Sequence, residues 1–352
     1  MSKLLNKKKG KSTITGNNKL QKFEKKWQNV VKRELGYLED YLCESVRSDD
    51  VILQTAALGL IEAGGKRLRP ALAYLAARLW GAALDDLLPL LAALELIHTG
   101  SLVHDDIIDV ARLRRGRPTV SYVHGDAAAL YVGDYLIGRA MELISVYHEE
   151  RLNLSLNRTV LQMCQGELKQ ERDFFRQQQT YRDYFKRIRC KTALLFAGSC
   201  ECGAILAGAD TAGVDSLWRW GYNLGMAFQI IDDILDLSAD EVALGKPTGN
   251  DLRQGNLSLA VLYALRLSPQ QEAAELSKLI ECLHNGKMSA LAPALDLVRK
   301  SGGLVYAVQT AERFLYKCEH EQSLWPQSRE RQTLADVLLS FQQQLNRLAT
   351  VN

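Results

Sequence analysis

Hydrophobic residues recur at intervals of three and four along most of the chain, the spacing that places them on one face of an α-helix. The pattern begins near Lys22 and is interrupted at Gly64-Gly65. Pro70 then opens an apolar helix that we expect to reach Trp80, because proline fits a first turn, where its missing N–H has no partner to lose. No useful stretch alternates between apolar and polar residues as a half-buried strand would.

The next helix leads into the most acidic part of the chain. Asp85 and Asp86 are placed to cap its N-terminus, and its apolar period continues to Asp109. A polar loop from Arg112 to Pro118 follows it. We expect the remaining helices over residues 123–147, 153–173, 180–208 and 212–237 and, after a glycine-rich loop at 238–258, onward to the C-terminus.

The composition favours one large all-α domain. Of the 352 residues, 47% are hydrophobic and 24% are charged, which is ordinary for a globular protein. The chain contains no run of 18 apolar residues, the length that a membrane-spanning helix needs. The 7 cysteines include no CxxC motif, which favours a reducing cytoplasm. We expect a disordered leader at residues 1–22 and a single helical domain at 23–352.

The leader is strongly basic. Residues 1–35 contain eleven Lys and Arg against two Glu, whereas acidic residues outnumber basic ones in the rest of the chain. Such a tail can bind nucleic acid or an anionic membrane, but residues 1–20 show no amphipathic period and no aromatic residues among the lysines. A solvated leader that binds no nucleic acid is therefore expected, and peripheral membrane association stays open.

Two acidic clusters carry the candidate chemistry. Both read Asp-Asp-x-x-Asp, and their members are Asp105, Asp106 and Asp109 in the first and Asp232, Asp233 and Asp236 in the second. On a helix the first and last aspartates of each cluster share a face, where their charges repel, and a helix C-terminus does not favour carboxylates. Two such clusters indicate bound cations, and oxygen ligands with room for phosphate suit Mg²⁺.

Basic residues accompany the clusters. Lys66, Arg67 and Arg69 surround the turn after Gly64-Gly65. Other basic residues are Arg114, Arg115, Arg117, Lys191 and Lys246. Such side chains, together with helix N-termini, bind phosphate. Because the chain has no Walker loop and no dinucleotide fingerprint, we expect two diphosphate groups rather than a nucleotide.

In these motifs the chain resembles the trans-isoprenyl diphosphate synthases, the all-α enzymes that join isoprene units head to tail. The resemblance covers about residues 25–350 and rests on GGKRLRP at 64–70, LIHTGSLVHDDIID at 96–109, LRRGRPT at 113–119, GDYL at 133–136, GE at 166–167, KTALLFA at 191–197, GMAFQIIDDILD at 225–236 and LGKPTGNDL at 244–252. It implies a helical bundle of the isoprenoid synthase type with a central active-site cavity. It also implies Mg²⁺ as the cofactor, with Mn²⁺ as a substitute.

The resemblance further implies roles for individual residues. The principal metal ligands would be Asp105, Asp109 and Asp232, supported by Asp106, Asp233 and Asp236. The allylic diphosphate, farnesyl or geranylgeranyl, would be held by Arg114, Lys191 and Lys246. The isopentenyl diphosphate site would consist of Lys66, Arg69, His98 and Arg115. The developing carbocation would face Thr192 and Gln229.

Product length is expected to depend on the residues just before the first cluster. In the family, aromatic side chains four and five residues before the first aspartate block the path of the growing chain, whereas here these residues are Ser101 and Gly100. We therefore expect more than four isoprene units, heptaprenyl to octaprenyl, which would suit a quinone side chain. The facing helix contains Tyr135, Ile137, Met141 and Leu143, and the sequence leaves open which of these side chains points inward.

One position departs from the family pattern, and several alternatives stay open. Asn256 stands where family members commonly have Lys, which should weaken diphosphate binding without abolishing it. A geranylgeranyl diphosphate synthase and a non-catalytic or partner-dependent subunit of a heteromeric synthase remain alternatives. A terpene cyclase is disfavoured because its second metal motif is missing, and a phosphohydrolase built on His104-Asp105 lacks further histidine ligands. A homodimer is expected by analogy, and a heterodimer is not excluded.

Overall fold

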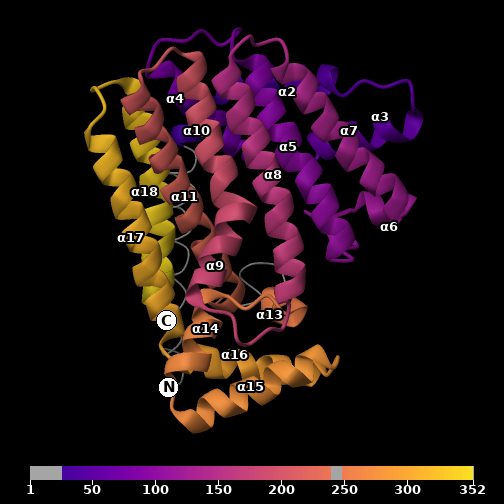
Figure 1. Cartoon of the computed structure of the whole chain (residues 1–352), viewed down its shortest axis with the longest axis vertical. Helices are drawn as coiled ribbons and strands as arrows, with labels where there is room; N and C mark the ends of the chain where they lie inside the picture. Colours follow the sequence, from indigo (N-terminus) through magenta and orange to yellow (C-terminus); the bar gives the residue numbers. More distant parts are fainter. Residues whose placement is uncertain (1–25, 239–247, 352) are drawn as a thin grey trace, which may run out of the picture.

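The computed structural model describes residues 26–238 and 248–351, and these residues form a bundle of α-helices (Figure 1). The helices of the first half are α2 (Lys32–Ser45), α3 (Val51–Glu62), α4 (Leu68–Arg78), α5 (Leu88–Ile108), α6 (Val120–His124), α7 (Asp126–Ile144) and α8 (Glu150–Asp173). A hairpin of two short strands, β1 (Leu113–Arg114) and β2 (Arg117–Pro118), joins α5 to α6.

The second half is also helical. Its elements are α9 (Tyr181–Ile188), the π-helical turn η1 (Arg189–Ala193), α10 (Leu194–Leu206), α11 (Thr211–Ser238), α13 (Asn250–Gln254), α14 (Leu259–Leu267), α15 (Gln270–His284), the 3₁₀ turn η2 (Met288–Ala290), α16 (Leu291–Lys300), α17 (Gly303–Ser323) and α18 (Arg329–Val351). The expected all-α fold is thereby confirmed. The basic leader at 1–22 and Lys246 lie outside the described residues.

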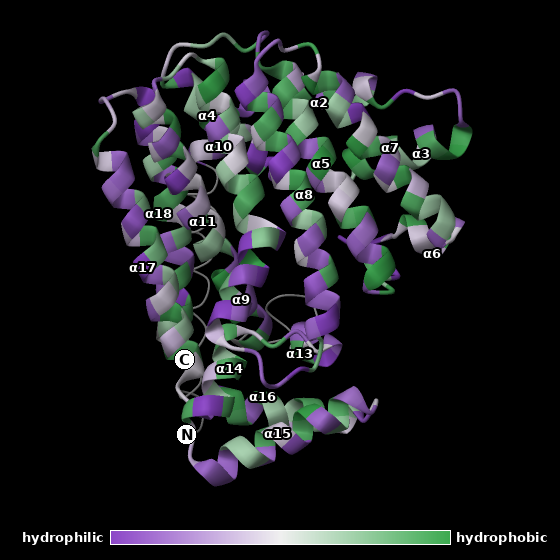
Figure 2. Ribbon diagram, viewed as in Figure 1, coloured by the Kyte–Doolittle hydropathy of each residue, from purple (hydrophilic) through white to green (hydrophobic). Residues whose placement is uncertain are grey.

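The core lies where the longest helices meet. α5 packs against α7, α10 packs against α4 and α11, and α11 also packs against α17. Figure 2 shows hydrophobic residues along α5 and α10, whereas the lower end of α8 is hydrophilic. A helix buried on more than one side is apolar on more than one side, so this packing anchors both α5 and α11, the helices that carry the acidic clusters. Within the described ranges, no helix combines the length and apolarity needed to cross a bilayer.

The expected N-terminal cap of α5 needs correction. α5 has Leu87 at its N-cap without a side-chain hydrogen bond, so Asp85 and Asp86 do not cap it. The two aspartates lie instead in a turn before the helix, in which the N–H groups of Leu87 and Leu88 donate to the Leu84 carbonyl, and the backbone carbonyl of Asp86 accepts a hydrogen bond from the hydroxyl of Tyr147 (2.7 Å).

The expected loop at 112–118 contains a β-hairpin. Arg115 and Gly116 have φ values of 52° and 77° between the paired residues Arg114 and Arg117. Two successive residues with positive φ form the tight turn that matches the twist of a hairpin. The apolar pattern could not predict this element, because the turn and not the strands determines it.

Candidate active site

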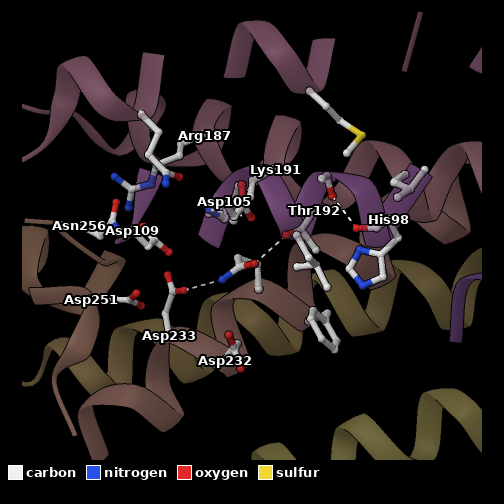
Figure 3. Close-up of a pocket in the computed structure, with 18 of the residues that line it drawn as sticks. His98, Asp105, Asp109, Arg187, Lys191, Thr192, Asp232, Asp233, Asp251 and Asn256 are labelled. Atoms are coloured by element: carbon white, nitrogen blue, oxygen red, sulfur yellow. Dashed lines mark hydrogen bonds and ion pairs between the residues drawn. The ribbon is translucent and has the colours of Figure 1, made fainter. Parts of the chain in front are cut away.

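The two acidic clusters face each other across one cavity. α5 contributes Asp105 and Asp109, and α11 contributes Asp232 and Asp233, to a cavity of about 280 Å³ (Figure 3). The spacing of four residues brings Asp105 and Asp109 to the same side of α5, as the sequence predicts. Asp251 of α13 lines the cavity beside the second cluster.

The remaining aspartate of each cluster lies outside this cavity. Asp106 is buried on another side of α5 and accepts a hydrogen bond from Arg114 Nε at 2.7 Å. The Asp236 carboxylate accepts hydrogen bonds from the backbone N–H groups of Asn250 and Asp251, both at 3.1 Å. These contacts fix the hairpin and α13, so Asp106 and Asp236 support the site from behind.

The carboxylates alone do not complete a metal site. In the part of the chain that the structure describes, no three His, Cys, Asp or Glu side chains converge closely enough to hold a metal ion. Burial raises the pKa of Asp109, and burial together with Asp232 raises the pKa of Asp233 to about 6, against hydrogen bonds that lower it. Buried oxygen ligands of this kind fit divalent cations that take their other ligands from phosphate and water.

A π-helical turn brings two polar residues into the cavity. Lys191 and Thr192 both lie in η1 and both line the cavity, in keeping with the frequent use of π-helical turns at functional sites. Lys191 Nζ lies 3.7 Å from a carboxylate oxygen of Asp105 and 3.7 Å from one of Glu167. Burial lowers the pKa of Lys191, but these carboxylates outweigh it and hold the pKa above its ordinary value.

A chain of hydrogen bonds connects η1 to the second cluster. The Thr192 hydroxyl donates to Gln229 Oε1 at 2.6 Å, and Gln229 Nε2 donates to Asp233 Oδ1 at 2.9 Å (Figure 3). The Tyr184 hydroxyl donates to the other oxygen of Asp233 at 2.7 Å. Thr192 and Gln229 therefore present fixed oxygen dipoles to the cavity.

Two of the four predicted isopentenyl diphosphate residues form one wall of the cavity, and the other two do not line it. Arg69 and His98 line the cavity. The Arg69 guanidinium lies 4.8 Å from the centre of the Phe196 ring, and its buried Nε has no hydrogen-bond partner. Arg115 donates a hydrogen bond to the carbonyl of Gly64, which holds it beside the turn that precedes α4. Lys66 lies in that turn but does not line the cavity.

Positive charge accumulates along this wall. Burial, together with Arg115, lowers the pKa of Arg69 to about 10 although Glu95 opposes the shift. Burial and the surrounding arginines lower the pKa of His98 well below its ordinary value. At neutral pH the wall therefore consists of charged arginines and a neutral histidine.

A second cavity adjoins the first and is largely apolar. It measures about 240 Å³ and lies between α5, α7 and α8. Ile97, Ile137 and Val160 line it, and it shares Ser101 and Asp105 with the first cavity. A hydrocarbon chain attached to a group at the first cluster would have a path into it.

The two predicted chain-length residues have different surroundings. Ser101 lines both cavities. A Cβ atom on Gly100 would lie 3.0 Å from the Gly133 carbonyl oxygen and 3.0 Å from Ile137 Cγ1, so Gly100 sets the approach of α5 to α7. On the facing helix Ile137 points inward, whereas the Tyr135 hydroxyl donates to a backbone carbonyl after α2 at 2.8 Å.

The structure adds residues that the sequence analysis did not assign. Glu167, Gln170, Arg187 and Asp251 line the cavities without a predicted role. The first and last lie in the quoted motifs GE and GNDL, which could have marked them. Gln170 follows Glu167 by three residues on α8, and Arg187 carries no signal in the sequence.

The comparisons with known proteins agree with this arrangement. Residues 50–298 match the polyprenyl synthetase family. The chain belongs to this family. It is 40% identical over 306 residues to heptaprenyl diphosphate synthase component 2 of Geobacillus stearothermophilus, covering 87% of this chain and 94% of that protein. The corresponding Bacillus subtilis protein is 36% identical over 320 residues, which are 88% of this chain and 90% of that protein.

A solved structure extends the agreement to the fold. The polyprenyl synthase of Caulobacter crescentus, complexed with calcium and isoprenyl diphosphate, matches with a TM-score of 0.84 and 32% identity over 91% of this chain and 97% of that one. The family membership confirms the expected isoprenoid synthase fold and a chain-elongating prenyltransferase activity.

Proposed function

We propose that this polyprenyl synthetase uses Mg²⁺ to join isopentenyl diphosphate to farnesyl or geranylgeranyl diphosphate. The product would be an all-trans heptaprenyl or octaprenyl diphosphate for a quinone side chain. The observation that carries this proposal is the junction of the two cavities at Asp105 and Ser101. A reaction that ionises a diphosphate and extends a hydrocarbon needs a charged cavity and an apolar path in contact.

The cavity-facing carboxylates would hold the cofactor. Mg²⁺, or Mn²⁺ as a substitute, would be bound by Asp105, Asp109 and Asp232, with Asp233 and Asp251 close behind. When bound, such ions neutralise charge that develops on a departing diphosphate. The Caulobacter crescentus relative forms a complex with calcium and isoprenyl diphosphate, which supports the use of a divalent metal here.

Protein side chains would assist the ionisation of the allylic substrate. As the bond between its C1 carbon and the diphosphate oxygen breaks, Lys191 and Arg114 would stabilise the leaving group, together with Lys246. The allylic cation left behind would face the oxygen dipoles of Thr192 and Gln229. These dipoles are already oriented by hydrogen bonds, so they stabilise the cation without reorganising.

The second substrate would complete the reaction. Arg69, Arg115, Lys66 and His98 would hold the diphosphate of isopentenyl diphosphate, and neutral His98 could donate an N–H without adding charge. The isopentenyl double bond then attacks C1, a carbon–carbon bond forms, and a proton leaves to the departing diphosphate. This chemistry needs no protein nucleophile.

A product assay tests the proposal. Purified protein with Mg²⁺, isopentenyl diphosphate and farnesyl diphosphate should form products of seven or eight isoprene units, and a chelator should abolish the activity. Products that stop at three or four units would contradict the long-chain proposal and favour geranylgeranyl diphosphate synthesis.

Assembly with a second chain has support of its own. The Bacillus subtilis and Geobacillus stearothermophilus relatives are each named component 2. On α8, three leucines spaced by seven residues are exposed: Leu154 (54%), Leu161 (63%) and Leu168 (58%). Because leucines repeated every seven residues share one face of a helix and suit packing against another helix, we propose that this face binds a second subunit, identical or different. Activity that appears only after addition of a separate partner would identify a heteromeric enzyme, and sedimentation analysis would give the state of the isolated chain.

A further inference from the structure

Arg187 is a buried cation that has no role in the reaction proposed above. It lies near the end of α9, is 8% exposed and lines the first cavity. Its Nη1 donates to Gln179 Oε1 at 3.1 Å, and its Nη2 donates to the Leu257 carbonyl at 2.7 Å. Since a guanidinium carries five N–H groups, these two bonds fix its position while other N–H groups remain.

Arg187 acts electrostatically on Asp233 of the second cluster and on Asp251 beside it. Asp233 receives its hydrogen bonds from the neutral side chains of Tyr184 and Gln229. Burial, followed by the charges of Asp233 and its neighbours, raises the pKa of Asp251 well above its ordinary value, and Arg187 opposes that shift. The charge of Arg187 therefore acts on the part of the cavity that contains Asp233 and Asp251.

Polar groups beside Arg187 lack partners. Asn256 immediately precedes Leu257 and lines the cavity, and its Oδ1 is buried without a hydrogen bond. The hydroxyl of Ser258 is also buried without a hydrogen bond. Figure 3 shows the Arg187 and Asn256 side chains directed toward the same part of the cavity as Asp251. Because unpaired buried polar groups are destabilising, these groups indicate a ligand at this place: the Ser258 hydroxyl can donate to a diphosphate oxygen, whereas Asn256 Oδ1 is an acceptor that suits a metal ion or a metal-bound water.

We propose that Arg187 is a positioning residue for the allylic diphosphate, whose charge offsets the second acidic cluster and so sets the affinity for the metal-bound diphosphate. This proposal rests on the proposed function. Arg187 lies on α9, away from the wall formed by Arg69 and His98, so its charge should affect the allylic substrate and not isopentenyl diphosphate.

Moving the charge within the cavity tests this role. Arg187→Gln should raise the KM for farnesyl diphosphate and the calorimetric Kd for inorganic pyrophosphate with Mg²⁺ about tenfold, the loss expected for one charge-assisted interaction. The KM for isopentenyl diphosphate should change less than about twofold. Adding Asn256→Lys to this variant should restore most of both losses, because it returns a positive charge but not the bonds to Gln179 and Leu257.

A matched variant controls for the loss of any arginine. Arg182 is exposed on the same helix and lines neither cavity, so Arg182→Gln should leave all three constants unchanged. Failure of Asn256→Lys to restore binding in a folded double variant, or equal effects on the two substrates, would overturn the proposal and leave Arg187 with a structural role only.

Two further measurements keep the test decisive. If Arg187→Gln does not fold by circular dichroism, Arg187→Lys keeps the charge and should bind pyrophosphate within about threefold of the unmodified protein. A tenfold loss in that folded variant would overturn the proposal. The binding measurement needs no turnover, so it separates the two ideas: absence of pyrophosphate binding by the unmodified protein would contradict the proposed function itself.

Discussion

The two acidic clusters share one sequence pattern, yet the structure balances their charges differently. The first cluster lies beside the ammonium of Lys191 at 3.7 Å and the guanidinium of Arg114 at 2.7 Å. In the second cluster, Asp233 receives hydrogen bonds from two neutral groups, the Gln229 amide and the Tyr184 hydroxyl, and burial raises its pKa to about 6. A repeated motif therefore does not imply repeated electrostatics, because the surrounding helices supply the compensating charges.

The clusters also differ in what lies next to them. Asp105 of the first cluster lines both cavities, whereas no described residue of the second cluster lines the apolar one. The first cluster would therefore orient the hydrocarbon tail as well as the diphosphate. The second would act on the diphosphate alone, which is the difference that the following variants examine.

The largest expected effect is loss of turnover on removal of a cavity-facing carboxylate. Asp105→Ala and Asp232→Ala should each lower turnover by about a thousandfold or more, because preorganised electrostatic stabilisation of the leaving group is lost. Steady-state assays with labelled isopentenyl diphosphate measure this. Asp106→Asn is the matched control, since Asp106 lies outside the cavity, and it should cost less than about tenfold. Turnover near the unmodified level in either alanine variant would contradict the metal assignment.

A smaller effect should separate Ser101 from Gly100. Ser101→Phe should shorten the product toward three or four isoprene units, because a ring at the mouth of a closely packed cavity cannot be bypassed at low energy. Gly100→Ala should leave product length unchanged but lower the free energy of unfolding by about 1–3 kcal/mol, since its Cβ would crowd Gly133 and Ile137. Chromatography of the products and thermal unfolding measure the two outcomes. A shorter product from Gly100→Ala with unchanged stability would show that Gly100 faces the cavity.

Ser101 and Gly100 show which features the sequence could predict and which it could not. The helical period predicted an all-α fold, and the spacing of Asp105 and Asp109 predicted their common face, because both depend on local geometry. The same period could not distinguish Ser101 from Gly100, since the position of α7 decides which of them meets a cavity.

Contacts between segments that lie far apart in the sequence could not be predicted either. Arg187 meets the Leu257 carbonyl 70 residues further along the chain, and Tyr184 meets Asp233 across 49 residues. Neither pair carries a pattern of its own, because only the packing of α9 against α11 and α14 brings them together. Family motifs marked the clusters, but not Arg187, whose charge acts on Asp233.

The smallest expected effect concerns α9, which brings Tyr184 and Arg187 to the second cluster. Thr180 and Asp183 cap this helix with reciprocal hydrogen bonds: the Asp183 N–H donates to Thr180 Oγ1 at 3.2 Å, and the Thr180 N–H donates to Asp183 Oδ2 at 3.0 Å. The hydrogen bonds from Thr180 lower the pKa of Asp183 to about 2 from its ordinary 3.8. Because the folded pKa lies below the unfolded one, ionised Asp183 stabilises the fold above about pH 4, and this contribution is lost as the pH falls toward 2.

Asp183→Asn should therefore lower the free energy of unfolding at pH 7 by about 0.5–1 kcal/mol, the usual range for a weakened helix cap. The difference from the unmodified protein should shrink as the pH is lowered from 7 to 3, because the aspartate of the unfolded chain, with its ordinary pKa of 3.8, takes up a proton over that interval whereas the folded one keeps its charge until about pH 2. Urea unfolding at both pH values measures this. The KM for farnesyl diphosphate should rise less than threefold and that for isopentenyl diphosphate should not change, since α9 serves only the second cluster. A stability difference that is equally large at pH 3 would assign the effect of Asp183 to its shape rather than its charge, and a change confined to isopentenyl diphosphate would show that α9 also serves the opposite wall.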